Sequence, residues 1–165
     1  MSADELVEEV DEQGNVLRVV TRAEMRAQRL RHRCVYLLVI DDGRLLVHQR
    51  APHKDVWPGR WDVAAGGVAG AGEPWRRAAR RELAEELGVD AEPVEVGGGS
   101  WEDDEVQVLG RVYVVEHAGP FRFDDGEVVD ARFVDLAELD ALLASHETCP
   151  DSVALALPWA RPRLR

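Results

Sequence analysis

The sequence predicts an α/β fold, more narrowly α+β, in which one mixed β-sheet lies between α-helices. Strand-like and helix-like segments are interleaved along the chain, yet they do not follow a regular βαβ repeat. No internal repeat, low-complexity linker or break in composition divides the chain. Its 165 residues, 45% of them hydrophobic, are enough for one sizeable core. We therefore expect a single domain over residues 1–165.

Residues 1–31 are expected to form a hairpin followed by a short helix. Leu6–Val10 and Val16–Val20 have strand-like composition and flank a turn-forming segment at 12–15. Thr21 and Glu24 have the spacing of a capping box, which predicts a helix that runs to about Arg29.

The central part of the chain carries the clearest signals. Cys34–Ile40 and Leu45–Gln49 are apolar segments joined by a short turn, as in a hairpin. Trp61–Ala65 is expected to be one short strand. Pro74 suits the first turn of a helix, and Gly88 suits its C-terminal cap, which predicts a helix between them.

The last third is expected to alternate strands with short helices. Alternating hydrophobicity predicts paired strands, and acidic or hydroxyl residues mark helix starts. The expected elements are strands at Val94–Trp101, Val106–Glu116 and Val128–Val134, a helix from Asp135 to about Leu143, a helix from Asp151 or Ser152 to Ala156, and a frayed tail at 158–165.

The charge of the chain limits its partners. With 32 acidic and 20 basic residues, the formal charge is -12, so we expect neither nucleic acid nor an anionic membrane as a partner. A phosphorylated substrate would need a local basic patch or a metal ion. Cys34 and Cys149 are expected to be reduced thiols, and the acidic start is unlike a signal peptide, so we expect a cytoplasmic protein.

Three glutamates share one face of the helix predicted between Pro74 and Gly88. Glu82, Glu85 and Glu86 are spaced i, i+3 and i+4 near the helix C-terminus, where like charges and the helix dipole both oppose them. A bound Mg²⁺ or Mn²⁺ would relieve this repulsion. A solvated acidic face, neutralised by nearby arginines, is the alternative.

The residues around the glutamates favour the metal site. Gly67, Glu73 and the run from Arg81 to Val89 resemble the Nudix box, residues 67–89, at every specified position. The resemblance implies the Nudix fold and diphosphate hydrolysis. It also implies that Glu82, Glu85 and Glu86 bind the metal, with Glu86 central, and that the Gly67 carbonyl is a further ligand. Arg81 would orient the carboxylates, and Glu73 would brace the loop against the helix.

A wider stretch, residues 30–67, resembles the Nudix branch related to type 1 isopentenyl-diphosphate isomerase. That resemblance implies that Arg50 and Lys54 hold a diphosphate and supply the local positive patch. His32 resembles a metal-ligand histidine of the isomerase, and a plain surface or strand-edge histidine is the alternative. Where the isomerase has its catalytic cysteine and a metal-binding histidine, this chain has Gly66 and Val68, which favours hydrolysis over isomerisation.

The expected reaction is attack of water on phosphorus with Mg²⁺ or Mn²⁺ bound. Glu85 and Glu127 are the candidate general bases, with the run from Glu102 to Glu105 as a weaker one. A nucleoside di- or triphosphate is the first expected substrate, and a nucleotide-sugar or a prenyl diphosphate stays open. The alternatives are an isomerase-like enzyme or a non-catalytic diphosphate-binding module. The sequence does not set the oligomeric state, and a homodimer is compatible with it.

Overall fold

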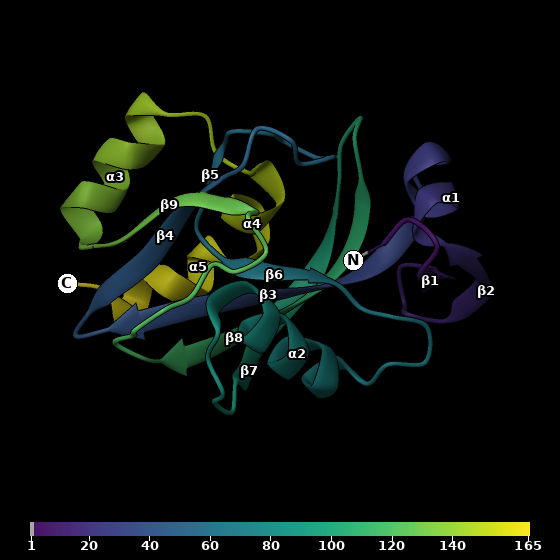
Figure 1. Ribbon diagram of the computed structural model, residues 1–165, viewed down its shortest axis with the longest axis horizontal. Coiled ribbons are helices and arrows are strands. Elements are labelled where there is room, and N and C mark those ends of the chain that lie inside the picture. The colour runs from purple at the N-terminus through teal and green to yellow at the C-terminus, as the bar shows by residue number, and fades with distance from the viewer. Residues whose placement is uncertain (1) are drawn as a thin grey trace.

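The structure, a computed structural model, describes residues 2–165 and is built on a seven-stranded sheet. Five strands follow the order β5-β4-β3-β8-β7, while β6 pairs with β3 and β9 pairs with β4 (Figure 1). The strands are β1 (Leu6–Val10), β2 (Val16–Thr21), β3 (Arg31–Asp41), β4 (Arg44–Arg50), β5 (Trp61–Asp62), β6 (Ala65–Val68), β7 (Val94–Glu102), β8 (Gln107–Glu116) and β9 (Val128–Val134). The helices are α1 (Arg22–Ala27), α2 (Trp75–Leu87), α3 (Leu136–Ser145), α4 (Pro150–Leu155), α5 (Leu157–Ala160) and a 3₁₀ turn, η1 (Arg161–Arg163).

The central strand is β3, and its pairing makes the sheet mixed. It runs parallel to β8 and antiparallel to β4 and β6. Residues 32–40 of β3 are all buried, as expected of a strand that is covered on both faces. The predicted fold class, a mixed sheet between helices, is confirmed.

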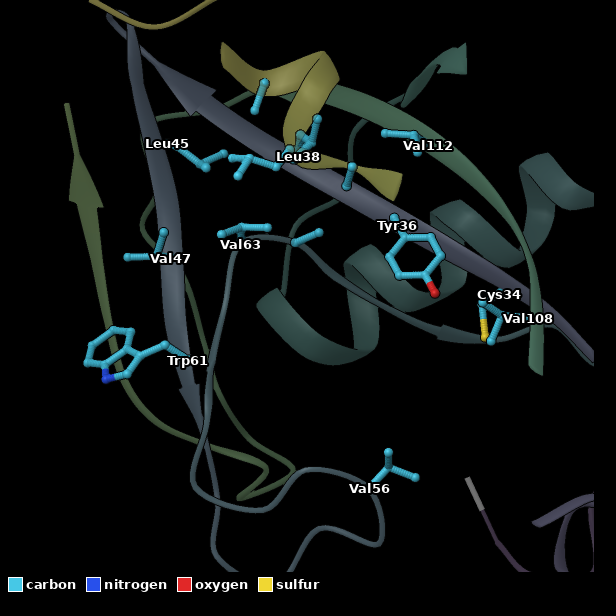
Figure 2. Close-up of a cluster of buried hydrophobic side chains, with 14 of the residues drawn as sticks. Cys34, Tyr36, Leu38, Leu45, Val47, Val56, Trp61, Val63, Val108 and Val112 are labelled. Atoms are coloured by element: carbon cyan, nitrogen blue, oxygen red, sulfur yellow. The ribbon is translucent and has the colours of Figure 1, made fainter. Parts of the chain in front are cut away.

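Two apolar clusters lie on the two faces of this sheet. On one face, Val35 and Leu37 pack with Leu83 and Leu87 of α2. On the other, Tyr36 and Leu38 belong to a cluster that also contains buried residues of α1, α3 and α5. Figure 2 shows this second cluster, with Cys34 and Tyr36 projecting from β3 toward the side on which Val56 lies. Side chains of β3 therefore alternate between the two layers.

The N-terminal hairpin and helix form as predicted. β1 and β2 pair antiparallel in a separate two-stranded sheet, and the Glu24 N–H donates to Thr21 Oγ1 at the start of α1. The hairpin is tied to the loop after β6, because the Ala71 N–H donates to the Leu6 carbonyl oxygen at 2.9 Å. The hairpin leads into α1, whose Arg22 and Arg26 line the cavity described below.

Two predicted boundaries were wrong. Trp61–Ala65 is not one strand: β5 ends at Asp62, whose Oδ1 accepts from the Ala64 N–H at 3.2 Å, and β6 begins at Ala65. This side-chain turn breaks the extended backbone between them. The last predicted helix starts at Pro150 with Cys149 at the N-cap position, rather than at Asp151 or Ser152, because proline fits the first helical turn.

The predicted fraying of residues 158–165 was also wrong. The chain continues through α5 and η1, and Ala160 is fully buried. The Arg165 N–H donates to the Gly43 carbonyl at 2.9 Å, and its carbonyl accepts from the Leu136 N–H at 2.7 Å. The tail is held by long-range backbone pairing. Among residues 2–165, no helix combines the length and the apolar composition needed to cross a bilayer.

Candidate active site

A cavity of about 450 Å³ lies beside the central strand β3, and its lining includes Val35 and Tyr36, which point to opposite faces of the sheet. Most of its walls come from α1, β3, the loop 54–57, β6, the C-terminal half of α2 and the loop 124–127, and single residues of β4, β5, β8 and α4 complete them. The cavity thus collects residues that are more than 100 positions apart in the sequence. Arg50, Lys54, Gly67 and Glu127 line it, together with the three glutamates of α2.

The local sequence explains why α2 can present these glutamates. The helix follows Pro74 and ends at Gly88, whose φ of 66° is the left-handed conformation that favours glycine. Ala79, Leu83 and the neighbouring apolar residues bury the opposite face against the sheet. Glu82 is buried, Glu86 is half-buried and Glu85 is exposed. The three carboxylates therefore lie at increasing distance from the core, at one edge of the cavity.

Arg81 is the cation that the carboxylates share. Its Nη1 donates to Glu82 Oε1 at 2.8 Å and to Glu85 Oε2 at 3.1 Å. Its Nε and Nη2 donate to the two oxygens of Glu73 at 2.8 and 2.9 Å, and Nη2 also reaches the Val68 carbonyl. The hydrogen bond from Arg81 lowers the pKa of Glu73. Arg81 thus contacts Glu73, Glu82 and Glu85, while the bracing role of Glu73 and the orienting role of Arg81 stay predictions.

Burial dominates the ionisation of Glu82 and Glu86. Burial raises the pKa of Glu82, even though Arg81 opposes the shift. Burial and then the charge of Glu82 hold the pKa of Glu86 well above its usual range, and the Gly66 N–H, at 3.2 Å from Glu86 Oε2, offsets this only in part. Glu82 shares Arg81 with Glu73 and Glu85, and Glu86 forms no ion pair within residues 2–165. A bound divalent cation would balance this excess of negative charge.

Gly66 and Gly67, at the start of the Nudix box, leave room for the Val35 backbone and the Glu82 carboxylate. A Cβ on Gly67 would lie 2.7 Å from Glu82 Oε1. A Cβ on Gly66, whose φ is +142°, would lie 1.9 Å from the Val35 carbonyl oxygen. Neither position accepts a side chain without a shift of its neighbours. The pairing of β6 with β3 therefore leaves no room for a catalytic side chain at Gly66. Val68, the second position at which this chain differs from the isomerase, is buried.

Lys54 and Glu127 face each other across the cavity mouth. Lys54 Nζ donates to Glu127 Oε2 at 2.7 Å. Burial alone would raise the pKa of Glu127, but the hydrogen bond and charge of Lys54 lower it overall. Arg50 lines the same cavity, and its guanidinium donates to the Val56 carbonyl at 2.9 and 3.2 Å. Arg50 therefore also shapes the loop 54–57.

The expected local positive patch was wrong, because acidic residues outnumber basic ones around the cavity. Nine carboxylates and four basic side chains line it, for a formal charge of about -5. The carboxylates are Asp55, Asp62, Glu82, Glu85, Glu86, Asp124, Asp125, Glu127 and Asp151, and the basic residues are Arg22, Arg26, Arg50 and Lys54.

Comparison with known proteins identifies the family. The family model described as NUDIX domain matches residues 30–154. This chain belongs to the Nudix family. It is 36% identical to the uncharacterized Nudix hydrolase YfcD of Escherichia coli (strain K12) over 163 residues, 98% of this chain and 89% of the relative. An uncharacterized Nudix hydrolase of Yersinia pestis is 39% identical over 157 residues, covering 94% and 85%. The chain is accordingly a Nudix hydrolase.

Solved structures agree with this assignment at the level of the fold. DR0079 from Deinococcus radiodurans superposes with a TM-score of 0.76 at 24% identity, covering 98% of this chain and all of that one. The NUDIX domain of Shewanella oneidensis NrtR, solved in complex with ADP ribose, gives 0.60 at 21%, covering 88% and 100%. None of these relatives carries an isomerase name, so the isomerase-related branch remains a prediction.

The donor set at the Nudix helix suits a hard cation. Within residues 2–165, no three Asp, Glu, His or Cys side chains already converge as a finished metal site requires. The reason is that Glu82 and Glu85 accept hydrogen bonds from Arg81, while Glu86 accepts one from the Gly66 N–H. Carboxylate and carbonyl oxygens are nevertheless the ligands that Mg²⁺ and Mn²⁺ prefer.

The acidic run from Glu102 to Glu105 lies outside the cavity lining. Asp103 Oδ1 accepts from the N–H groups of Glu105 and Val106, which makes this segment the turn between β7 and β8. Trp57 does line the cavity, and it makes an edge contact with Trp101 at 6.0 Å between ring centroids. Among the tryptophans of residues 2–165, Trp57 lines the cavity, whereas Trp61, Trp75, Trp101 and Trp159 do not.

For His32 the sequence left a metal-ligand-like histidine and a surface or strand-edge histidine open, and it did not point to Arg22, Arg26, Tyr36 or Asp151 as cavity residues. His32 is not a surface or strand-edge histidine: it is 1% exposed in the central strand and lines the cavity. Arg22 and Arg26 reach the cavity from α1, and Tyr36 donates to Asp151 Oδ2 at 2.7 Å. Burial raises the pKa of Asp151 to about 6. The period-two spacing of His32 and Tyr36 was the available signal, since it places both on one face of the strand.

Proposed function

We propose that this Nudix hydrolase cleaves a diphosphate linkage in a small molecule by attack of water on phosphorus, with Mg²⁺ or Mn²⁺ bound. One observation carries the proposal: the carboxylates of the Nudix helix, Lys54 and Glu127 line a single cavity. This combines a cation site, a phosphate contact and a candidate base within one space. The cavity volume of about 450 Å³ is in the range of small-molecule sites.

Glu82, Glu85 and Glu86, with the Gly67 carbonyl, would hold the metal. Bound there, it would supply Lewis-acid stabilisation of the diphosphate charge and lower the pKa of the attacking water. Arg81 keeps Glu82 and Glu85 oriented through its charge-assisted hydrogen bonds. Binding would require these carboxylates to turn partly away from Arg81, while the Arg81–Glu73 pair continues to fix the helix against the loop.

Lys54 and Arg50 would bind the diphosphate. The Lys54 side chain is 13% exposed, and its ammonium group already contacts a carboxylate oxygen of Glu127. A phosphate oxygen would compete for the same ammonium group. Arg50 already donates to the Val56 carbonyl through Nε and Nη2. To bind phosphate, it would either use its remaining N–H groups or give up this contact. We therefore assign the stronger diphosphate contact to Lys54 and a shared binding and loop-positioning role to Arg50.

Glu127 is the general base that the geometry favours over Glu85. A general base must be ionised, and Lys54 keeps the pKa of Glu127 below its usual value. Its contact with Lys54 places it next to the phosphate contact. Glu85 is exposed, and its carboxylate accepts from Arg81. That arrangement suits a metal ligand better than a base that must reach a water inside the cavity.

A nucleoside di- or triphosphate, or a derivative, is the proposed substrate in a cytoplasmic setting. Trp57 at the cavity wall supplies an aromatic surface next to the phosphate contacts. The NrtR domain with the same fold was solved with ADP ribose, a diphosphate that carries a nucleoside. The two together support a nucleotide more than a prenyl chain.

The test is a library of nucleoside di- and triphosphates, nucleotide-sugars and isopentenyl diphosphate, incubated with the enzyme and Mg²⁺. We expect release of phosphate or nucleoside monophosphate, which chelation of the metal abolishes. Isopentenyl diphosphate in deuterated water serves as the control for isomerisation. Labelled dimethylallyl diphosphate at an enzymatic rate would overturn the proposal. Tight binding of a diphosphate without turnover would assign a binding module instead.

A further inference from the structure

The loop between β6 and α2 has a flexible sequence, yet the structure holds each of its backbone N–H groups. Residues 69–73, here called the box loop, read Ala-Gly-Ala-Gly-Glu, and glycine gives a backbone many accessible conformations. Gly72 uses this freedom, with a left-handed φ of 70°. Nevertheless, every N–H group from residue 69 to residue 73 donates a hydrogen bond within the protein. The conformation of the box loop is therefore set by its acceptors.

Two of these acceptors belong to the N-terminal hairpin. The Ala71 N–H donates to the Leu6 carbonyl at 2.9 Å, and the Gly72 N–H donates to Glu8 Oε1 at 2.7 Å. Leu6 and Glu8 lie on β1, outside residues 30–154 that the family model matches. A segment outside the matched Nudix domain thus holds the loop that belongs to its most characteristic motif.

Arg33 of β3 holds the carbonyl groups of the same loop. Its Nη1 donates to the Glu73 carbonyl at 2.8 Å, and its Nη2 donates to the Gly70 carbonyl at 3.0 Å. Nη2 also lies 3.2 Å from Glu8 Oε2, and the side chains of Arg33 and Glu8 are only 9% and 12% exposed. The Trp75 ring packs against the guanidinium, with its centroid 5.0 Å from Cζ. Glu8 and Arg33 therefore form a largely buried ion pair that bonds to both N–H and carbonyl groups of the box loop.

The box loop ends at the residue that holds Arg81. Glu73 accepts from Nε and Nη2 of Arg81 at 2.8 and 2.9 Å. Nη1 of the same guanidinium donates to Glu82 and Glu85. A shift of Glu73 would therefore move the cation that contacts two of the proposed metal ligands. Hydrogen bonds and one ion pair connect Glu8, on the hairpin, to these carboxylates.

We propose that Glu8 and Arg33 are positioning residues for the metal site of the Nudix helix. By fixing the box loop they hold Glu73, and through Glu73 they hold Arg81 against the carboxylates that would bind the cation. Groups that orient metal ligands from behind typically change metal affinity by about 10- to 100-fold. The hairpin is then part of the working site. This inference rests on the proposed function for the metal site itself.

The experiment measures metal binding and loop protection, so it does not depend on turnover. Electron paramagnetic resonance detects free Mn²⁺, and a titration gives its Kd for the wild type, Glu8→Ala, Glu8→Gln and Glu86→Gln. Amide hydrogen exchange of the box loop is measured on the metal-free proteins. Glutamine keeps an oxygen that can accept from the Gly72 N–H, but it loses the charge that pairs with Arg33.

The matched control is Glu9→Ala. Glu9 is the next residue of β1, and it pairs with Arg18 of the same hairpin. Its removal weakens the hairpin without removing a hydrogen bond to the box loop.

We expect Glu8→Ala to raise the Kd for Mn²⁺ about 10-fold and to speed exchange of the Ala71 and Gly72 N–H groups. Glu8→Gln should lie between this variant and the wild type, and Glu9→Ala should match the wild type. A double-mutant cycle with Glu73→Ala tests the path. If the effect of Glu8 passes through Glu73, the two changes together should raise the Kd by less than the product of their separate factors.

Three results would overturn the inference. The first is an unchanged Kd in Glu8→Ala while Glu86→Gln loses Mn²⁺ binding, which would leave the ion pair a purely structural one. The second is an equal loss in Glu9→Ala, which would assign the effect to the hairpin in general. The third is a full product of the two factors in the cycle with Glu73→Ala. A Kd that Glu86→Gln leaves unchanged would instead defeat the proposed metal site, and the inference with it.

Discussion

Replacing Glu86 by glutamine tests whether the buried carboxylates of the Nudix helix are kept for a cation. The substitution keeps the size of the side chain and an oxygen that can accept from the Gly66 N–H, but it removes one of two neighbouring buried charges. We expect Glu86→Gln to make the metal-free protein more stable and nearly inactive. A stabilising change that abolishes turnover is the pattern expected of a functional site that is electrostatically strained.

The size of the effect follows from the i, i+4 spacing of Glu82 and Glu86. Side chains at this spacing lie about 5–6 Å apart, and at an effective dielectric constant near 20 their repulsion is about 3 kcal/mol. Glu86 is half-buried, so solvent screening reduces this to about 1–3 kcal/mol. Unfolding entropy is about 2.1 cal/mol/K per residue, so 165 residues give about 0.35 kcal/mol/K. The expected rise in Tm of the metal-free variant is therefore about 3–9 °C.

The assay is thermal unfolding with EDTA and with Mg²⁺, together with diphosphate hydrolysis. Mg²⁺ at 100 times its Kd would stabilise the wild type by about 2.7 kcal/mol, roughly 8 °C, and should stabilise Glu86→Gln far less. Glu116→Gln is the matched control, because Glu116 is exposed at the end of β8. A variant that keeps wild-type turnover, or that gains as much from Mg²⁺ as the wild type, would refute the assignment.

Three further predictions concern the rest of the site. Lys54→Ala should raise KM for the diphosphate at least about 10-fold while the Mg²⁺ requirement stays the same, and unchanged kinetics would make Lys54 an ordinary loop charge. Glu127→Gln should slow turnover more than Glu105→Gln does. The base must be ionised, and the pKa of Glu127 lies below its ordinary 4.5. The wild-type rate should therefore fall only as the pH drops below about that value. This acidic limb of the pH–rate profile should vanish in Glu127→Gln. Gly66→Ala should lower the free energy of unfolding by more than about 3 kcal/mol, because its Cβ would meet the Val35 carbonyl. The Cβ of Gly126→Ala would meet nothing within 4 Å, so this control should cost about 1 kcal/mol. Equal losses in Tm for the two variants would contradict the packing argument.

Local signals in the sequence were enough to predict most elements. The capping box at Asp135 and Glu138 starts α3 as expected, and both of its hydrogen bonds are present. Gly88 ends α2 in the left-handed conformation, as expected of a glycine at a C-terminal cap. These features depend on residues within one or two helical turns, so a single sequence contains the information that sets them.

Features made by distant residues were not predictable in the same way. The docking of Arg165 depends on backbone groups of Gly43 and Leu136, which no local pattern connects. His32 is buried beside a cavity that distant segments, α1 and the loop 54–57, also line. The spacing of the Nudix box predicted that its glutamates lie together, but it did not reveal that Arg81 occupies two of them.

The charge of the cavity connects these observations to the choice of substrate. With a formal charge of about -5, the lining repels a free diphosphate more strongly than Lys54 and Arg50 attract it. The same charge concentrates divalent cations, and two such ions would bring the site close to neutrality. A diphosphate should therefore bind tightly only together with Mg²⁺ or Mn²⁺. The acidic composition that first argued against a phosphorylated ligand thus favours one that arrives with a metal ion.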